Sequence, residues 1–421
     1  MTNQIKVGVV GCGYWGPNLI RNFRSLPECQ LKLMCDLSEA RLKHLRSLYP
    51  EVDGETDFNH VLNGAGLDAV VIATAVRLHF PMAKASLLAG KHTFIEKPMA
   101  ASVAECEELV SIAKQKGLVL MIGHTFLYSP AVRKIKEIVD KGDIGEIRYI
   151  SARRLNLGLF QKDINVAWDL APHDLSIILH IMEEQPVTVN CRGSAHITPG
   201  IEDVTTMCLS FRKQRTAIIH SSWLDPRKIR EMTIVGSKRM IVYDDVAPLE
   251  KLRIFDARVE RPPHYDTFAE FHYAYHYGDM YAPYIKQEEP LKTECQHFLD
   301  CIRESRSPLT NGNRGLDLVR ILEASSNSLR CGGGPIELTS EVNGTRHTAE
   351  PLIIAPAVGH TGGPAHVNGN GNGNGNGNGN GKTNGDAAHA NGNGNGNGNR
   401  YLNGAKPSRR RSQPKPASNI V

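Results

Sequence analysis

Gly11-Cys12-Gly13-Tyr14-Trp15-Gly16 is the motif from which the fold of this 421-residue chain follows most directly. It lies between the apolar run 5–10 and a segment, 17–26, with helical spacing of apolar residues. In a G-x-G-x-x-G turn, the first glycine permits the tight turn and the second lets the backbone approach a pyrophosphate. The third allows close helix–strand contact, and free amides at the helix N-terminus receive the phosphates. The motif therefore predicts a dinucleotide site that contains Gly11, Gly13, Tyr14, Trp15 and Gly16.

A carboxylate at the expected distance supports this interpretation. Asp36 ends the next predicted strand, twenty residues after Gly16. There it would accept hydrogen bonds from the adenosine ribose hydroxyls and repel a 2′-phosphate. We therefore expect NAD rather than NADP, although Arg41, a turn further on, weakens that preference. A glycine turn that binds no ligand is the alternative for the motif taken alone.

The first 125 residues alternate between strand and helix signals. The predicted strands are 5–10, 30–35, 69–73, 93–95 and 118–122, and the predicted helices are 17–26, 38–48, 80–89 and 103–116. The segment 69–73 is apolar and rich in β-branched residues, as is typical of a strand buried on both faces. Strands separated by helices of this length imply right-handed crossovers. We expect a doubly wound parallel sheet, an α/β Rossmann domain, over residues 1–125.

The pattern changes after residue 125. Predicted strands at 147–155, 187–196, 204–211, 216–223, 231–235 and 240–244 follow one another with few helices between them. Short turns between strands indicate a mainly antiparallel sheet. Helices are predicted at 131–140, 171–182, 290–304 and 315–329. We expect an α+β domain with an open, mainly antiparallel sheet over residues 126–340.

The last part of the chain, 341–421, has a different composition. Asparagine and glycine alternate without interruption at 368–381 and again at 391–399, and arginines follow at 409–411. Without apolar residues to bury, this segment cannot offset its ordering entropy, so we expect a disordered tail with a basic end.

Composition restricts the class of protein. Hydrophobic residues make up 41% of the chain, and the net charge is only +5. Neither value requires a nucleic acid or a membrane surface as partner. The nine cysteines are odd in number and contain no C-x-x-C pair, so we expect no disulfides and no metal site. No secretory signal or membrane-length apolar run is apparent, and a cytoplasmic protein is expected.

Glu96-Lys97-Pro98 directly follows the predicted strand 93–95. The carboxyl ends of strands in such sheets face the ligand crevice. A lysine there could reach the nicotinamide and stabilise a developing alkoxide on the reacting oxygen. Taken alone, the tripeptide could equally be a solvated loop. Pro98 would rigidify the turn, in either the cis or the trans form.

A third group of residues lies in Trp168-Asp169-Leu170-Ala171-Pro172-His173-Asp174. On a helix, Asp169 and His173 would lie four residues apart and share a face. Oxidation of a secondary alcohol requires a base for the hydroxyl proton, and histidine suits that role near neutral pH. On the residues alone, His173 could instead cap the helix or lie in the core. The same alternative holds for His124 and His180.

Together, the glycine motif, Glu-Lys-Pro and Asp-x-x-x-His resemble the Gfo/Idh/MocA family over residues 4–340. The resemblance implies that Lys97 contacts both cofactor and substrate oxygen, that Asp169 assists, and that His173 is the acid/base. It adds Glu96 and, from the loop 74–79 beside the nicotinamide, Thr74 and His79 to the cofactor site. That loop departs from the family's commoner Thr-Pro-Asn form. The resemblance also implies a homodimer or homotetramer formed through one face of the second sheet.

Family substrates are mostly sugars, cyclic polyols and nucleotide sugars. The motifs are similar to those of the branch that oxidises position 3 of UDP-linked N-acetyl sugars. Arg153 and Arg154 could meet a diphosphate, although successive strand residues point to opposite faces, so at most one should face the site. The hypothesis is an NAD-dependent dehydrogenase acting on a secondary hydroxyl of a sugar or nucleotide sugar. An inositol-type polyol dehydrogenase and a non-catalytic NAD-binding regulator remain alternatives.

Overall fold

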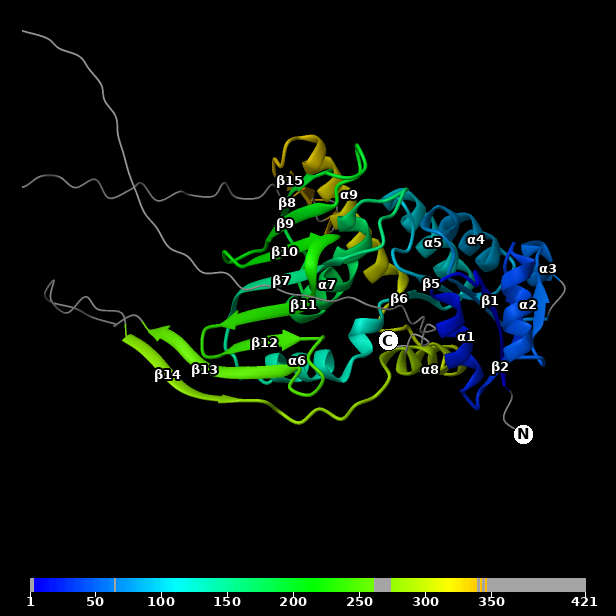
Figure 1. The fold of residues 1–421 in the computed structure, drawn as a ribbon, viewed down its shortest axis with the longest axis horizontal. Helices are drawn as coiled ribbons and strands as arrows, with labels where there is room; N and C mark the ends of the chain where they lie inside the picture. The colour runs from blue at the N-terminus through cyan, green and yellow to red at the C-terminus, as the bar shows by residue number, and fades with distance from the viewer. Residues whose placement is uncertain (1–3, 64–65, 261–273, 339–340, 343–344, 347–421) are drawn as a thin grey trace, which may run out of the picture. The chain divides into compact units, whose positions relative to one another are not determined.

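The computed structural model of the chain describes residues 4–63, 66–260, 274–338, 341–342 and 345–346 (Figure 1). Both of its large sheets belong to one compact unit. Most of the predicted tail lies outside the described residues, as do both of its Asn-Gly runs and its arginines. Its first residues include a short hairpin, β16 (Glu341–Val342) with β17 (Thr345–Arg346).

The first sheet has six strands in the order β3-β2-β1-β4-β5-β6, and every neighbouring pair is parallel. Its strands are β1 (Ile5–Val10), β2 (Cys29–Cys35), β3 (Asp53–Glu55), β4 (Ala69–Ile72), β5 (His92–Glu96) and β6 (Leu120–Gly123). The helices between them are α1 (Gly16–Arg24), α2 (Glu39–Leu48), α3 (Phe58–Asn63), α4 (Val76–Leu88) and α5 (Val103–Lys116). The predicted Rossmann architecture is confirmed.

Local sequence explains where these helices begin and end. The side chain of Ser38 caps α2 by accepting a hydrogen bond from the amide of Arg41, and Ser102 caps α5 in the same way. Gly117 ends α5 in the left-handed conformation, with φ of 63°. Helix α4 begins at Val76, four residues before the predicted start, and contains Pro81 within it. Proline is tolerated in the first turn of a helix, so a start at residue 80, just before Pro81, was plausible from the sequence, but it was wrong.

The second sheet has nine strands in the order β14-β13-β12-β11-β7-β10-β9-β8-β15. Its strands are β7 (Ile147–Leu157), β8 (Thr188–Ser194), β9 (Val204–Ser210), β10 (Thr216–Ser222), β11 (Leu224–Gly236), β12 (Met240–Asp244), β13 (Leu252–Glu260), β14 (Ala274–Tyr281) and β15 (Ile336–Glu337). Among the strand pairings described for this second sheet, only the β7–β10 pair is parallel. The expected mainly antiparallel sheet is confirmed, and β13, β14 and β15 are additional to the prediction.

The remaining helices follow β6 in the chain, and some of them pack on the second sheet while others contact the first domain. They are the 3₁₀ helix η1 (Thr125–Tyr128), α6 (Pro130–Asp140), α7 (Val166–Met182), α8 (Pro290–Arg303) and α9 (Gly312–Arg330). Helix α7 packs on β7, β9 and β10. On the other face of the sheet, side chains such as Tyr149 and Ile218 are exposed. Helix α7 starts five residues before the predicted Ala171, which brings Asp169 into its first turn.

Residues of α8 and of the segment just before α9 complete the core of the first domain. Phe298 of α8 packs edge-on against Phe23 of α1 and Phe94 of β5, with ring centroids 6.3 and 5.7 Å apart. All three rings are fully buried. Asn311 pairs with Met121 of β6 in an isolated bridge. The six-stranded sheet therefore depends on residues almost two hundred positions downstream of its last strand.

Candidate active site

The glycine turn is shaped by contacts that exclude side chains at two positions and leave the third open. Gly11 has φ of 94°, and a Cβ there would lie 2.6 Å from the carbonyl oxygen of Ala73. A Cβ on Gly16 would lie 1.9 Å from the carbonyl oxygen of Gly11, whereas one on Gly13 would meet nothing within 4 Å. No side chain caps α1 at Trp15. The backbone thus forms an open cradle at a helix N-terminus, which fits a dinucleotide pyrophosphate.

Asp36 lies directly behind this turn. Its Oδ2 accepts a hydrogen bond of 2.7 Å from the amide of Cys12, and its Oδ1 accepts one of 2.8 Å from the amide of Ser38. Arg41 Nη1 approaches Oδ2 at 3.5 Å. The carboxylate is therefore fixed between the glycine turn and the start of α2, where an adenosine ribose would lie in this fold.

His79 holds the loop between β4 and α4. Its side chain is buried, with Nδ1 2.8 Å from the carbonyl oxygen of Pro98 and Nε2 3.0 Å from that of Thr74. Burial lowers the pKa of the ring. The ring thus links Thr74 to the peptide segment after β5, where the Lys97–Pro98 bond is cis. Among the described residues, both polar atoms of His79 contact backbone.

Lys97 and Asp169 are brought together from different domains of the sequence. The ammonium Nζ of Lys97 donates to the carbonyl oxygen of Asp169 at 2.8 Å and lies 3.4 Å from its Oδ1. The other carboxylate oxygen accepts a hydrogen bond of 3.1 Å from the indole Nε1 of Trp223. Both side chains of the Lys97–Asp169 pair retain about a fifth of their exposure. The ammonium is fixed yet accessible, as a group that contacts substrate must be.

His173 lies one helical turn after Asp169. Its ring packs edge-on against Phe126, with centroids 5.0 Å apart. Its Nδ1 is buried and has no hydrogen-bond partner among the described residues. Burial, followed by the charges of Lys97 and Arg154, holds the pKa of His173 well below its ordinary value. The ring is therefore neutral near pH 7 and can accept a proton.

Arg153 and Arg154 point to opposite faces of β7. Arg154 is buried and bonds Asp174 of α7 through two nitrogens, at 3.0 and 2.9 Å. Its guanidinium also stacks 4.6 Å from the Phe126 ring centroid, beside His173. Arg153 is exposed and pairs with Glu231 at 2.6 Å. Arg154 therefore lies near the candidate catalytic residues, with its guanidinium engaged by Asp174, and Arg153 lies on the other face.

Glu96 connects the cofactor turn to Lys97. Trp15 Nε1 donates a hydrogen bond of 2.7 Å to Glu96 Oε1. Burial raises the pKa of Glu96 to about 7, and the adjacent Lys97 opposes that shift.

Another buried carboxylic acid, Glu294 of α8, accepts a hydrogen bond of 2.7 Å from Thr125 Oγ1. Burial and then the charge of Glu96 raise the pKa of Glu294 well above its usual value. Tyr14, by contrast, is exposed.

Several residues of the site were not predicted from the sequence: Phe126, Asp174, Trp223 and Glu294. Phe126 and Asp174 are close in sequence to motif residues, so proximity to His124 and His173 could have drawn attention to them. Trp223 and Glu294 reach the site through strand pairing and helix packing, which no local pattern reveals.

Within the described part of the chain, no group of three or more histidine, cysteine, aspartate or glutamate side chains could hold a metal ion. None of the described helices is long and apolar enough to cross a membrane.

Two family models match the chain. Residues 5–124 match an oxidoreductase family with an NAD-binding Rossmann fold, Gfo/Idh/MocA. Residues 132–242 match the Gfo/Idh/MocA C-terminal domain. The chain belongs to the Gfo/Idh/MocA family of oxidoreductases. Its cradle at Gly13 and the carboxylate of Asp36 agree with the NAD-binding description of the first model.

Named relatives of this Gfo/Idh/MocA oxidoreductase act on different substrates. It is 28% identical to UDP-N-acetylglucosamine 3-dehydrogenase of Acidithiobacillus ferrooxidans, over 57% of this chain and 74% of that protein. It is 23% identical to myo-inositol 2-dehydrogenase of Thermotoga maritima, over 77% of this chain and 96% of that protein. The solved structure of the Acidithiobacillus enzyme superimposes with a TM-score of 0.64 at 24% identity, covering 78% of this chain and 99% of the other.

Proposed function

We propose that this protein is an NAD-dependent dehydrogenase that oxidises a secondary hydroxyl of a sugar or nucleotide sugar. The observation that carries the proposal is the pairing of Lys97 with Asp169 beside a histidine held neutral. The Lys97 ammonium is 2.8 Å from the Asp169 carbonyl oxygen. His173 is on the same helix as Asp169, four residues further on.

In the proposed reaction, His173, Lys97 and Asp169 each have a separate role. Neutral His173 accepts the proton of the substrate hydroxyl, and the Lys97 ammonium stabilises the negative charge that develops on the oxygen. Asp169, held by Trp223, keeps Lys97 in place. Gly13 and Asp36 would hold NAD, and the cofactor would supply the acceptor for the hydride of the carbon, so that the overall reaction gives a ketone, reduced cofactor and one proton. Because burial and then the charges of Lys97 and Arg154 disfavour a charged His173, the ring gives up the accepted proton readily.

The preference for NAD over NADP rests on Asp36. Its carboxylate, fixed by two backbone amides, would accept bonds from the ribose hydroxyls and repel a 2′-phosphate. Replacing Asp36 by Ser removes that repulsion and leaves Arg41 without its carboxylate partner. We expect the variant to bind NAD more weakly and to gain affinity for NADP, measured by titration with both cofactors. An unchanged NAD-to-NADP ratio would remove Asp36 from this role.

The choice of substrate is the finer part of the proposal. Similarity to the Acidithiobacillus enzyme supports a UDP-linked N-acetyl sugar, with oxidation at position 3. Similarity to the Thermotoga enzyme supports a cyclic polyol as the second candidate. Arg154, bound to Asp174, would have to exchange partners to meet a diphosphate.

A substrate panel tests the proposal. NADH is measured with UDP-N-acetylglucosamine, its uronate, myo-inositol and glucose, after the protein has been denatured so that retained cofactor is counted. Lys97→Ala and His173→Ala should each abolish turnover while NAD affinity stays nearly unchanged. Lys84→Ala, at a partly exposed lysine on α4, is the control. Full activity in either site variant would refute the assigned roles. Tight NAD binding without NADH from any substrate would favour a non-catalytic regulator.

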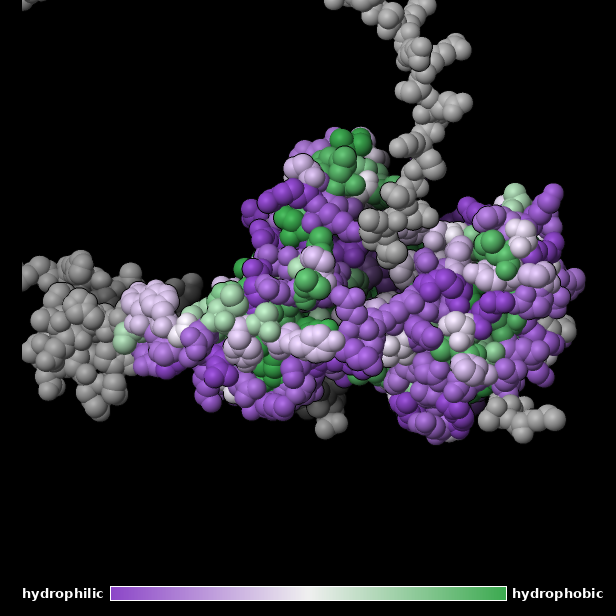
Figure 2. All heavy atoms as spheres, turned by 60° about the horizontal axis from the view of Figure 1, so that its bottom comes forward, coloured by the Kyte–Doolittle hydropathy of each residue, from purple (hydrophilic) through white to green (hydrophobic). Residues whose placement is uncertain are grey.

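We also infer a homodimer or homotetramer that uses the outer face of the nine-stranded sheet. Tyr149 and Ile218 are each about two-fifths exposed on that face, and Tyr275 and Tyr277 are exposed on β14. Figure 2 shows a mixture of pale green, lavender and purple atoms on the segment at the left that carries β13 and β14. Sedimentation velocity of the protein and of Ile218→Glu should show an oligomer and a smaller species, respectively. A monomeric parent protein would contradict the inference.

A further inference from the structure

The imidazole of His173, the proposed base, is not oriented by a hydrogen bond through its buried nitrogen. Its Nδ1 has no hydrogen-bond partner among the described residues. A proton-accepting histidine is ordinarily oriented by a hydrogen bond from its other ring nitrogen to a third group. The two nearest acidic residues of α7 are engaged elsewhere. Asp169 pairs with Lys97, and Asp174 bonds Arg154 through both carboxylate oxygens. A different kind of contact must therefore hold the imidazole.

The side chain that contacts the imidazole is Phe126. The two rings meet edge-on, with centroids 5.0 Å apart and planes inclined by 66°. Aromatic rings favour this arrangement, and it restricts the direction in which each ring can point. Phe126 is partly buried at the edge of the core. Its value as a support for His173 therefore depends on how firmly Phe126 itself is held.

The short segment that carries Phe126 is anchored on both sides. In the 3₁₀ helix η1, Thr125 Oγ1 donates a hydrogen bond of 2.7 Å to Glu294. The hydroxyl of Tyr128 lies 3.1 Å from Thr310 Oγ1. Glu294, Tyr128 and Thr310 are all buried. The backbone of Phe126 therefore cannot shift without breaking hydrogen bonds in the interior, which is costly.

The ring of Phe126 is in turn held by Arg154. The guanidinium carbon lies 4.6 Å from the ring centroid, within the range of a cation–π contact. Two hydrogen bonds, of 3.0 and 2.9 Å, fix the guanidinium on Asp174, and both side chains of this ion pair are only 5% exposed. Asp174 directly follows His173 on α7. The contacts therefore form a closed loop that leaves the helix at Asp174 and returns to it at His173.

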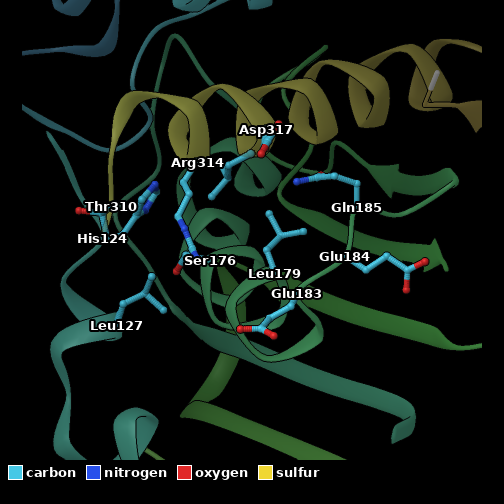
Figure 3. A pocket seen from close by; sticks show the side chains of 11 residues that line it. His124, Leu127, Ser176, Leu179, Glu183, Glu184, Gln185, Thr310, Arg314 and Asp317 are labelled. Atoms are coloured by element: carbon cyan, nitrogen blue, oxygen red, sulfur yellow. The ribbon is translucent and has the colours of Figure 1, made fainter. Parts of the chain in front are cut away.

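The space next to this loop is not densely packed. Leu127, adjacent to Phe126, and Ser176, one helical turn after His173, both border a cavity of about 300 Å³ (Figure 3). Phe126 and His173 are not part of its lining. Because unfilled space lies beside both elements, the imidazole would have room to turn if the ring of Phe126 were removed.

We propose that Phe126 is a positioning residue that holds the His173 imidazole in the direction from which it accepts the substrate proton. The closed loop through Arg154 and Asp174 does for His173 what a hydrogen-bonded carboxylate does for the histidine of a catalytic triad. An apolar support also suits a neutral base, since it places no negative charge against the ring. The inference rests on the proposed dehydrogenase function, in which His173 is the proton acceptor.

Kinetics of Phe126→Leu, which keeps an apolar side chain but removes the ring, test the proposal. The substrates are UDP-N-acetylglucosamine and myo-inositol. We expect kcat to fall roughly 10- to 100-fold, because a base misplaced by about 1 Å loses that much. KM and the dissociation constant of NAD should stay unchanged. Phe126→Tyr, which keeps the ring, should recover most of kcat. Phe58→Leu, at a partly buried phenylalanine of α3, is the matched control.

Two kinetic outcomes overturn the proposal. Parent values of kcat in Phe126→Leu would show that the imidazole does not need the ring. A higher KM with unchanged kcat would identify Phe126 as a substrate contact instead. Circular dichroism and thermal unfolding verify the fold of each variant, and Phe126→Met takes the place of Phe126→Leu if the latter does not fold.

A measurement without substrate separates this inference from the proposed function. In the full chain labelled with ¹⁵N-histidine, the ring nitrogens of His173 are assigned by their loss in His173→Ala. Their NMR signals should be narrow in the parent protein and in Phe126→Tyr, and exchange-broadened in Phe126→Leu. Unchanged signals in Phe126→Leu overturn the positioning role, whether or not the protein oxidises a sugar. Broadened signals in a protein that turns over neither substrate would refute the dehydrogenase and leave Phe126 as the support of His173.

Discussion

The indole of Trp15 donates a hydrogen bond of 2.7 Å to the carboxylate of Glu96, across 81 residues of sequence. Trp15 precedes the first residue of α1, and Glu96 is the last residue of β5. The bond therefore joins the dinucleotide turn to the strand end that carries Lys97. It is one direct link between the cofactor cradle and the candidate catalytic lysine.

Replacing Trp15 by Phe should destabilise the protein in a pH-dependent way. The bond lowers the pKa of Glu96, so its loss should raise that pKa above the present value of about 7. A carboxyl group with a raised folded-state pKa loses stability as pH rises from its unfolded value, so the variant should lose more at pH 9 than at pH 5.5. We expect a loss of about 1.5–3 kcal/mol at pH 9 by urea unfolding. Tyr14→Phe, at an exposed position, should show no such trend, and an equal loss at both pH values in Trp15→Phe would contradict the link to Glu96.

Two glycines of the turn should respond differently to alanine. A Cβ on Gly16 would clash with the Gly11 carbonyl, so Gly16→Ala should lower stability and abolish NAD binding. Gly13 faces open space, so Gly13→Ala should fold normally and still bind NAD poorly. Thermal unfolding and NAD titration of both variants provide the comparison. Normal NAD affinity in Gly13→Ala would argue that the pyrophosphate lies elsewhere.

The neighbouring arginines of β7 form a matched pair for stability measurements. Arg154→Met leaves the buried Asp174 carboxylate unpaired and should cost about 3–5 kcal/mol in unfolding free energy. Arg153→Met removes an exposed ion pair and should cost about 0–1 kcal/mol. Adding Asp174→Leu to Arg154→Met should recover part of the loss. Equal costs for the two single variants would mean that burial does not distinguish these pairs.

His124 should contribute to instability in acid. Its pKa is about 3 in the folded protein, against an ordinary value of 6.5. The unfolded chain therefore binds a proton that the folded chain does not, and stability is lost as pH falls from 6.5 towards 3. Between pH 7 and pH 5, His124→Phe should lose about 2 kcal/mol less than the parent protein in urea unfolding. His44→Phe, at an exposed histidine, is the control, and identical acid profiles of His124→Phe and parent would exclude a buried neutral His124.

The first domain was largely predictable because its signals are local. Strand–glycine–helix order and helix caps are encoded within a few residues, and the predicted helix 103–116 has the bounds of α5. The start of α7 was misplaced because Pro172 resembles a first-turn proline. In the structure, Asn165 caps the helix by accepting a hydrogen bond of 3.2 Å from the amide of Trp168, and Pro172 lies within it. Strand β14 was not predicted, since most of its residues are exposed and show no alternation of burial.

The candidate site was predictable in part for the same reason. Lys97, Asp169 and His173 stand in short motifs, so their types and spacing could be interpreted without coordinates. The pairing of Lys97 with Asp169 depends on how two distant segments pack, and it becomes visible only in the fold. Arg154 shows the limit most clearly, because its alternation on β7 was foreseeable and its bidentate bond to Asp174 was not.

The interlocked rings of Phe23, Phe94 and Phe298 also bear on how this chain can be divided. Cutting after residue 125, between the two sheets, would strip the ring of α8 from the other two and leave β6 without its bridge to Asn311. Such an N-terminal fragment would expose an aromatic surface and a free strand edge, both of which promote aggregation. During synthesis, the dinucleotide-binding half must therefore await the arrival of α8 before it can reach its final packing.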